Sequence, residues 1–304
     1  MNEFLPEGTG SALFNPKDEK ELTEAFERRL YLEAKPYRCD SEHNLHFIIG
    51  GVHAVMPREE CAEGIADGSV RDIAIISRVN KPTGFYITDL SVSPDGEKTA
   101  RLSRLVRQTE CRENYIDKLV PGDVIDAKIT RLESFGAFCD IGSGIISLLP
   151  VDSISVSRIP SADARFRNSQ SIKAVVKNID EKGRILLSHK ELLGTWEENA
   201  ALFSTGETVT GIVRSTESYG VFVELTPNLA GLAEFTPLAR AGQTASVYIK
   251  NINPEKMKIK LIIVDTEAAD STFREPKYFI SEGHIDFWRY SPECSERLVC
   301  TSFN

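Results

Sequence analysis

The sequence predicts a mainly β protein made of tandem modules of five short strands, joined by short helices and preceded by an N-terminal helix. The first observation is an internal repeat, because the stretch from Gly122 to Ile141 recurs 84 residues later, from Gly206 to Leu225. The second is a Gly followed by five residues and a Pro, which marks three segments. Repeats of this kind indicate duplicated structural modules. Besides the opening Gly, the two long copies share Glu133/Glu217, Ser134/Ser218, Gly136/Gly220 and Phe138/Phe222.

The repeated stretch has the alternation of a strand, in which successive side chains point to opposite faces. Ala137, Cys139 and Ile141 share a small apolar face, whereas Phe138 lies with Asp140 on the other face. An aromatic beside a carboxylate on a polar face favours a functional role, with a plain core position as the alternative. The second copy repeats the pattern with Val221, Val223 and Leu225 inward and Phe222 beside Glu224.

A further aromatic residue stands three positions before each of these phenylalanines. It is Phe135 in the first copy and Tyr219 in the second, and each directly precedes a Gly. A Gly at that point permits a tight bend or a bulge. We expect this bend to bring the two rings of each copy together.

The Gly-to-Pro marker predicts a third strand that begins at a bulge and leaves the sheet at Pro. Aligned without gaps, Gly51–Pro57 matches Gly144–Pro150 and Gly231–Pro237. The segment around Ser103 also echoes the one around Ser188. The copy that contains Gly51–Pro57 lacks the aromatic-Gly-x-Phe segment, so we expect it to keep the module's shape without its binding face.

These repeats divide the chain into seven predicted parts, three of which we call modules one, two and three. The parts are an N-terminal extension with a helix (1–36), degenerate module one (37–103), a helical linker (104–118), module two (119–193), a linker (194–204), module three (205–265) and a C-terminal tail (266–304).

Apolar spacing predicts the elements within these parts. Leu22, Phe26 and Leu30 form a stripe at helical spacing, which predicts a helix over 16–34. The tail has apolar stretches at 278–280 and 285–290, which we expect to form a hairpin that docks on a module. The five strands predicted for module two are 124–131, 135–141, 144–149, 171–180 and 184–188.

Composition limits the possible classes of protein. The formal net charge is −9, yet residues 119–194 carry ten basic and nine acidic side chains, so the acidity lies mainly at the two ends. This predicts a modest electrostatic contribution to nucleic-acid binding. The six Cys show no regular pairing, which is typical of reduced thiols in a cytoplasmic protein. No apolar run reaches the roughly 18 residues of a membrane span, so we expect no membrane association.

Module two has five short strands, a Gly-marked third strand, the F-G-A-F turn and a closing D-E-K-G-R-I-L-L-S run at 180–188. Together these features resemble the RNA-binding repeat of ribosomal protein S-one. The resemblance is close for 119–190, good for 205–262 and weak for 37–103. It implies that the modules are tandem five-stranded OB-fold barrels of the S-one type, and that the chain is a short bacterial S-one-like protein.

The resemblance also implies which residues contact RNA. In the family, two aromatics, a His on the third strand and an Asp and an Arg at the last hairpin meet single-stranded RNA. The matching positions are Phe135, Phe138, Ser147 in place of His, Asp180 and Arg184 in module two, and Tyr219, Phe222 and Lys258 in module three. Lys128, on the outward face of the first strand, is a further candidate for phosphate contact. Glu234 aligns with the His in module three, which predicts weaker RNA binding there.

Other kinds of site have weaker support. Cys39, His43, His46, His53 and Cys61 match no usual zinc spacing, so we expect no metal and no cofactor. His189 at a strand end is interpreted as structural. Asp180 and Glu181 are adjacent and would face apart, which makes a poor acid–base pair. We therefore expect no catalytic residues and no enzyme activity.

The first functional hypothesis is a non-enzymatic protein that binds single-stranded RNA or mRNA in translation, with the small ribosomal subunit as a further partner. It would act by stacking bases on outward aromatics. A protein-interaction scaffold whose barrels have lost RNA binding is one alternative. An accessory subunit of an RNA-processing enzyme is another.

Overall fold

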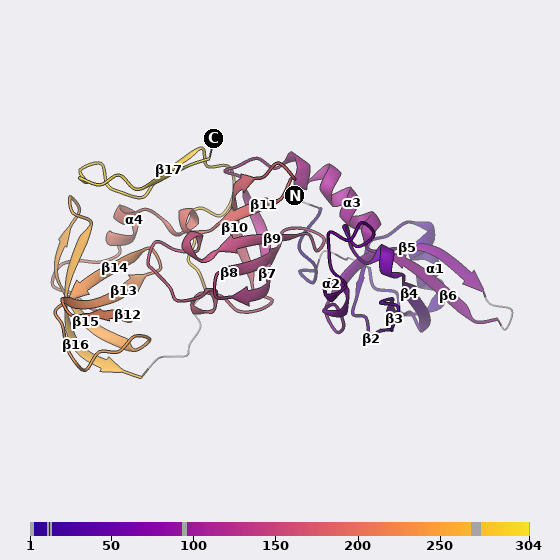
Figure 1. Cartoon of the computed structure of the whole chain (residues 1–304), viewed down its shortest axis with the longest axis horizontal. Coiled ribbons are helices and arrows are strands. Elements are labelled where there is room, and N and C mark those ends of the chain that lie inside the picture. The colour runs from indigo at the N-terminus through magenta and orange to yellow at the C-terminus, as the bar shows by residue number, and fades with distance from the viewer. Residues whose placement is uncertain (1–2, 11, 13, 93–95, 269–274, 304) are drawn as a thin grey trace. The chain divides into compact units, whose positions relative to one another are not determined.

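The computed structural model describes residues 3–10, 12, 14–92, 96–268 and 275–303. It confirms the mainly β class, with two closed five-stranded barrels and a related open sheet, all with short connecting helices (Figure 1). The chain divides into two compact units. Unit 1 comprises Met1–Leu119, Asp126–Lys128 and Asp140–Ile146, and unit 2 comprises Val120–Ile125, Ile129–Cys139 and Ser147–Asn304.

Module one lies in unit 1 and forms a six-stranded sheet in the order β1-β5-β6-β4-β3-β2, which is an open half-barrel. Its core contains Phe47 and Phe85, with Leu22 and Ala25 of α1 packed into the same cluster. Its elements are α1 (Glu19–Glu27), β1 (Leu32–Ala34), β2 (Arg38–Cys39), β3 (Leu45–Ile49), β4 (Val52–Met56), α2 (Ile73–Ile76), β5 (Thr83–Val92), β6 (Lys98–Ser103) and α3 (Leu105–Asn114), with 3-10 turns at Arg58–Glu60 and Ile116–Lys118.

The N-terminal helix is shorter than the predicted span of 16–34. Helix α1 begins after Asp18, whose side chain caps it by accepting the backbone N–H of Glu21. It ends because Arg29 adopts a left-handed backbone with φ 48°, which turns the chain towards β1. Leu30 still packs on the core, so the apolar stripe was interpreted correctly but it continues past the end of the helix.

Module two forms the first closed barrel, barrel 2, in the order β10-β11-β9-β8-β7. Its strands agree with the predicted ones to within two residues at each end. Ala137, Cys139 and Leu149 fill its interior, as the strand alternation predicted for the first two. The elements are β7 (Val124–Glu133), β8 (Gly136–Asp140), β9 (Ile146–Pro150), β10 (Ser171–Ile179) and β11 (Ile185–Ser188), with 3-10 turns at Val151–Ser153, Ala162–Ala164 and Lys190–Leu193.

Module three forms the second closed barrel, barrel 3, in the order β12-β13-β14-β16-β15. Helix α4 (Trp196–Ala200) precedes it and begins with a capping box formed by Thr195 and Glu198. Trp196 joins the buried cluster of this barrel. The strands are β12 (Thr208–Glu217), β13 (Gly220–Thr226), β14 (Leu229–Ala233), β15 (Thr244–Asn253) and β16 (Lys258–Glu267).

The tail contains a two-stranded antiparallel pair, but it is not the predicted pairing of 278–280 with 285–290. Strand β17 (Phe287–Arg289) pairs with β18 (Cys300–Ser302), whereas 278–280 forms no strand. Trp288 and Tyr290 belong to the same buried cluster as the core of barrel 3. The apolar stretch at 285–290 therefore docks as expected, and its strand partner was missed because 300–302 has no apolar alternation.

The strand registers correct one sequence alignment. Leu148 of β9 pairs with Leu186 of β11, and Leu232 of β14 pairs with Lys260 of β16. A Cβ added to Gly136 would lie 2.4 Å from the Leu149 carbonyl oxygen, and one added to Gly220 would lie 2.5 Å from that of Ala233. Ala233 is thus the counterpart of Leu149. By the same register Gly231 corresponds to Ser147, three residues from Gly144, with which the sequence had aligned it.

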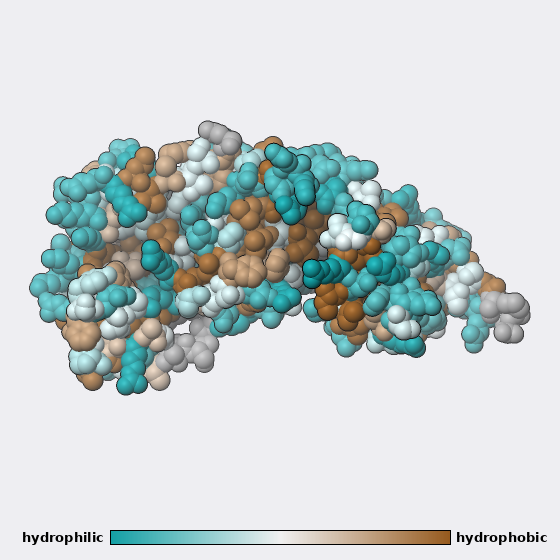
Figure 2. Space-filling view, in the orientation of Figure 1, coloured by the Kyte–Doolittle hydropathy of each residue, from teal (hydrophilic) through white to brown (hydrophobic). Residues whose placement is uncertain are grey.

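Hydrophilic side chains cover most of the face drawn in Figure 2, with apolar ones in separate patches between them. No helix in the described part of the chain is long and apolar enough to cross a bilayer.

Candidate nucleic-acid interface

The paired aromatic residues have nearly the same geometry in both barrels. The ring centroids of Phe135 and Phe138 lie 6.1 Å apart at 87°, and those of Tyr219 and Phe222 lie 6.2 Å apart at 87°. Phe135 is 54% exposed and Tyr219 68% exposed, while the second ring of each pair is half-buried. Each barrel thus presents one open aromatic face held by an edge-to-face partner, which suits base stacking.

Glycine is needed between the two rings for a physical reason. Gly136 and Gly220 have φ values of 157° and 158°, at the limit of the region that other residues avoid. A Cβ there would collide with the backbone of the neighbouring strand. The predicted bend is therefore present, and close approach of two strands creates it.

Barrel 3 extends its aromatic pair into a row of outward side chains across neighbouring strands. Phe222 pairs with Leu232, Leu232 with Lys260, and Lys260 with Asn251. Lys258 lies two residues from Lys260 on the same exposed face of β16. Sequence reasoning selected Lys258 and missed Lys260, although the alternation K-I-K at 258–260 was a signal for it.

The last hairpin differs between the barrels. In barrel 2, Arg184 Nε donates to Asp180 Oδ2 at 2.7 Å, and Asp180 Oδ1 also accepts the backbone N–H groups of Lys182 and Arg184. The backbone N–H and the guanidinium of Arg184 lower the pKa of Asp180. In barrel 3 the matching pair is Asn253 and Lys258, which oppose each other across β15 and β16. The sequence alignment of these two hairpins is thus confirmed by the strand register.

Ser147 is not displayed beside the aromatics. It is buried on β9, and its hydroxyl donates to the backbone carbonyl of Ile185. The outward positions of this strand are Ile146 and Leu148. In barrel 3 the counterpart of Ser147 is Gly231 rather than Glu234, because the strand register differs from the gapless alignment. Glu234 therefore gives no reason to expect weaker RNA binding by module three.

Lys128 is also engaged within the protein. Its ammonium group donates to the backbone carbonyls of Glu7 at 2.9 Å and Gly8 at 3.0 Å. All three residues belong to unit 1. Lys128 thus anchors the N-terminal segment, and a phosphate would have to compete with these two acceptors.

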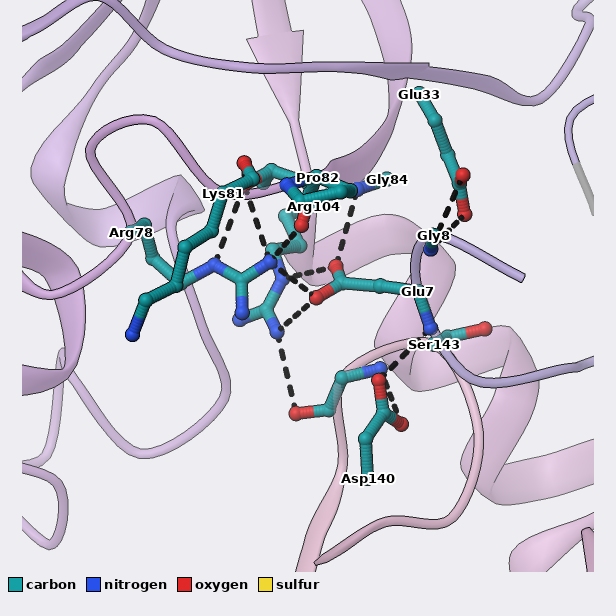
Figure 3. A network of polar contacts seen from close by, with 12 residues as sticks. Glu7, Gly8, Glu33, Arg78, Lys81, Pro82, Gly84, Arg104, Asp140 and Ser143 are labelled. Carbon is teal, nitrogen blue, oxygen red and sulfur yellow. Dashed lines mark hydrogen bonds and ion pairs between the residues drawn. The ribbon is translucent and has the colours of Figure 1, made fainter. Parts of the chain in front are cut away.

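Asp140, predicted on the outward face, is instead buried in a polar network (Figure 3). Its carboxylate accepts the backbone N–H groups of Glu7, Gly142 and Gly144. Burial and the neighbouring Glu7 carboxylate raise the pKa of Asp140 to about 6. Glu7 is itself buried, but Arg104 and Arg78 outweigh that burial and lower the pKa of Glu7 to about 2.

Glu224 is the counterpart of Asp140 in barrel 3 and is buried too. Its carboxylate forms ion pairs with Arg165 at 2.5 Å and Arg214 at 2.8 Å. Arg165 comes from the β9–β10 connection of barrel 2, so this site joins the two barrels within unit 2. The periodicity was right for both phenylalanines, but it could not show that the carboxylates are covered, Asp140 by the N-terminal segment and Glu224 by Arg165 and Arg214.

Of the five residues considered for a metal, His46 and His53 contact each other, with His46 Nδ1 3.2 Å from His53 Nε2. His46 Nε2 lies 2.8 Å from an Asp40 oxygen, and the buried thiol of Cys61 donates to the backbone carbonyl of Met56. The hydrogen bond from His46 lowers the pKa of Asp40. Among the described residues, no group of three or more His, Cys, Asp or Glu has a metal-holding arrangement.

Comparison with known proteins agrees with this geometry. Residues 118–190 match the family described as the S1 RNA binding domain. This stretch contains the aromatic pair of barrel 2 and the Asp180–Arg184 hairpin. The resemblance predicted from the motifs is thereby confirmed, and it supports nucleic-acid binding by this module.

The curated relatives extend the similarity beyond that module. Small ribosomal subunit protein bS1 of Staphylococcus aureus (strain COL) is 30% identical over 191 residues, which cover 58% of this chain and 49% of that protein. The bS1 homolog of Bacillus subtilis (strain 168) is 29% identical over 181 residues, covering 55% of this chain and 47% of that protein. The chain thus spans about half the length of these curated relatives.

One solved structure is a multidomain protein with nucleic acid binding domains from Streptococcus pneumoniae. It is 12% identical, covers 78% of this chain and 74% of its own, and has a TM-score of 0.26. With a TM-score this low, it adds nothing to the functional argument.

Proposed function

We propose that this chain is a non-enzymatic single-stranded RNA-binding protein that acts on mRNA in translation. The observation that carries the proposal is the aromatic pair, which recurs with the same ring distance and angle in both barrels. Stacking a base on such a ring contributes roughly 1–3 kcal/mol and tolerates any base sequence. The similarity to bS1 proteins supports a role at the small ribosomal subunit as part of the same proposal.

The cations around each pair support an RNA ligand. Arg184 is exposed in the turn before β11 of barrel 2, and Lys258 and Lys260 are exposed on β16 of barrel 3. In each barrel one strand, β9 or β14, lies between these cations and the aromatic strand. Since the chain has a net charge of −9, we expect few phosphate contacts and a shallow dependence of affinity on salt.

The test is a fluorescence-anisotropy titration of labelled single-stranded RNA at low salt. The wild-type chain binds, and the double variant Phe138→Ala, Phe222→Ala binds at least about tenfold more weakly because a ring is lost from each barrel. Absence of wild-type binding at low salt contradicts the proposal. RNA cleavage that persists through stringent purification would instead favour a role in RNA processing.

A further inference from the structure

Strand β16 of barrel 3 continues beyond the point where the matching strand of barrel 2 ends. From the registers, Ile262 is the counterpart of Ser188, the last residue of β11, yet β16 runs on to Glu267. On one side, β15 accompanies it to the end through the pair Thr244 and Glu267. On the other side, β14 ends at Ala233. Within the described residues, the edge over 262–267 that faces away from β15 has no strand partner.

A groove of about 250 Å³ lies along this edge, between 234–238 and 262–266. It carries exposed apolar side chains from both sides. Phe235 and Leu238 project from the segment after β14, and Ile262 and Val264 project from β16. Natural proteins usually blunt an edge strand with charge, Pro or a covering segment, so an open edge lined by large apolar residues favours a docking site.

The charge of the groove indicates what would bind. Glu234 and Asp265 are its charged lining residues, and the described lining contains no Lys or Arg. Two carboxylates repel a phosphate backbone, which argues against RNA as the occupant. They attract cationic side chains. Two copies joined edge to edge through β16 would bring their Asp265 and Glu267 carboxylates together, which like-charge repulsion opposes.

We propose that this groove binds an extended segment of a partner protein, in which apolar residues alternate with Lys or Arg. The segment would add to the free edge of β16 as an extra strand. Six edge residues span roughly 20 Å, enough for about six residues of added strand. Its apolar side chains would pack on Phe235 and Val264, and its cations would lie near Glu234 and Asp265. The groove begins at Ile262, two residues beyond Lys260, and its lining includes neither ring of the aromatic pair proposed to bind RNA.

The test uses three fluorescein-labelled heptapeptides and the full chain. One alternates Val and Lys, one alternates Val and Glu, and the third has the Val-Lys sequence with N-methyl groups on alternate amides, which remove strand hydrogen bonding. The Val-Lys peptide should bind at least about tenfold more tightly than either of the others. Bound peptide should also slow hydrogen exchange of the amides in 262–267.

Two variants and a control locate the site. Val264→Lys and, separately, Leu238→Lys should each reduce the affinity for the Val-Lys peptide at least about tenfold. Ile73→Lys on module one should leave that affinity unchanged. Both groove variants should keep their affinity for single-stranded RNA.

Several results overturn the proposal: equal binding of the N-methylated peptide, binding unaffected by both groove variants, a matching loss of RNA affinity, or a wild-type dimer that Val264→Lys dissociates. Failure of RNA binding in the wild type would contradict the proposed function and leave this test intact.

Discussion

Barrels 2 and 3 share an aromatic pair of the same geometry and differ in the charged residues around it. Barrel 2 has the Asp180–Arg184 ion pair at its last hairpin, whereas barrel 3 has Lys258 and Lys260 with Asn253 at the turn. The two rings and the Gly that lets neighbouring strands approach occur together in both barrels. The charged residues around them have been rearranged.

The buried carboxylates show the same contrast. Asp140 and Glu224 occupy matching positions after the second phenylalanine, and both are buried. Asp140 accepts backbone N–H groups, one of them from the N-terminal segment, whereas Glu224 forms ion pairs with two arginines. The same strand position thus fastens a different neighbour in each barrel.

The largest expected effect separates these two carboxylates. Glu224→Gln should lower the free energy of unfolding by about 3 kcal/mol, because it leaves Arg165 and Arg214 as uncompensated buried charges. Asp140→Asn should cost only about 1 kcal/mol, because burial already disfavours the charged form and raises its pKa to about 6. Urea unfolding measures both. Equal losses would show that the carboxylates do not differ in the way described.

The second prediction uses His189, since residues 205–265 of barrel 3 contain no histidine. Burial lowers the pKa of His189 to about 4 from 6.5, so the folded state prefers the neutral ring. Its folded pKa lies below its unfolded pKa, so its stabilising effect is complete above pH 6.5. That effect is lost as pH falls towards 4, by about 3 kcal/mol at most.

Hydrogen exchange resolved by segment at pH 7 and pH 4.5 tests this difference. Amides of β10 and β11 should lose more protection than those of β12 and β13, beyond the intrinsic change of exchange rate with pH. The variant His189→Gln is the control, and it should show a smaller difference between the two pH values. A loss confined to barrel 3 would contradict the assignment.

The third prediction compares the aromatic pairs directly. Two double variants each remove one stacking platform: Phe135→Ala with Phe138→Ala, and Tyr219→Ala with Phe222→Ala. Each should reduce the affinity for single-stranded RNA by roughly tenfold or more, since the two platforms have the same geometry. Anisotropy titrations measure the loss. If only the barrel 2 pair matters, the similarity of the two platforms has no functional meaning.

The smallest effect concerns the cation that differs between the barrels. Lys260→Leu should reduce the slope of log affinity against log salt by about 0.7, and Leu186→Lys, at the matching position of barrel 2, should increase it by a similar amount. A salt series of the same titration gives both slopes. No change in either variant would remove Lys260 from the interface.

Much of the fold could be predicted from the sequence, because strand alternation and the internal repeat are local signals. They identified the strands of barrel 2 to within two residues and the aromatic pairs with their bend. The partner of β17 was missed, since residues 300–302 show no apolar alternation. The alignment at Gly231 failed because a Gly-to-Pro marker says nothing about cross-strand register.

The candidate site was predicted less completely. The rings at 135 and 219 are exposed as expected, but Ser147 is buried and Lys128 is held by backbone carbonyls. Alternation predicts which face a side chain takes within a strand. It cannot predict which segment covers that face, so the burial of Asp140 and Glu224 could only be seen in the structure.

Under the proposed function, both barrels contact single-stranded RNA through their paired rings. Photo-crosslinking of single-stranded RNA containing 4-thiouridine, followed by mass spectrometry of the peptides, tests it most directly. We expect crosslinks on the segments that carry Phe135 and Phe138 and on those that carry Tyr219 and Phe222. Crosslinks confined to other segments, with both aromatic pairs unlabelled, would contradict it.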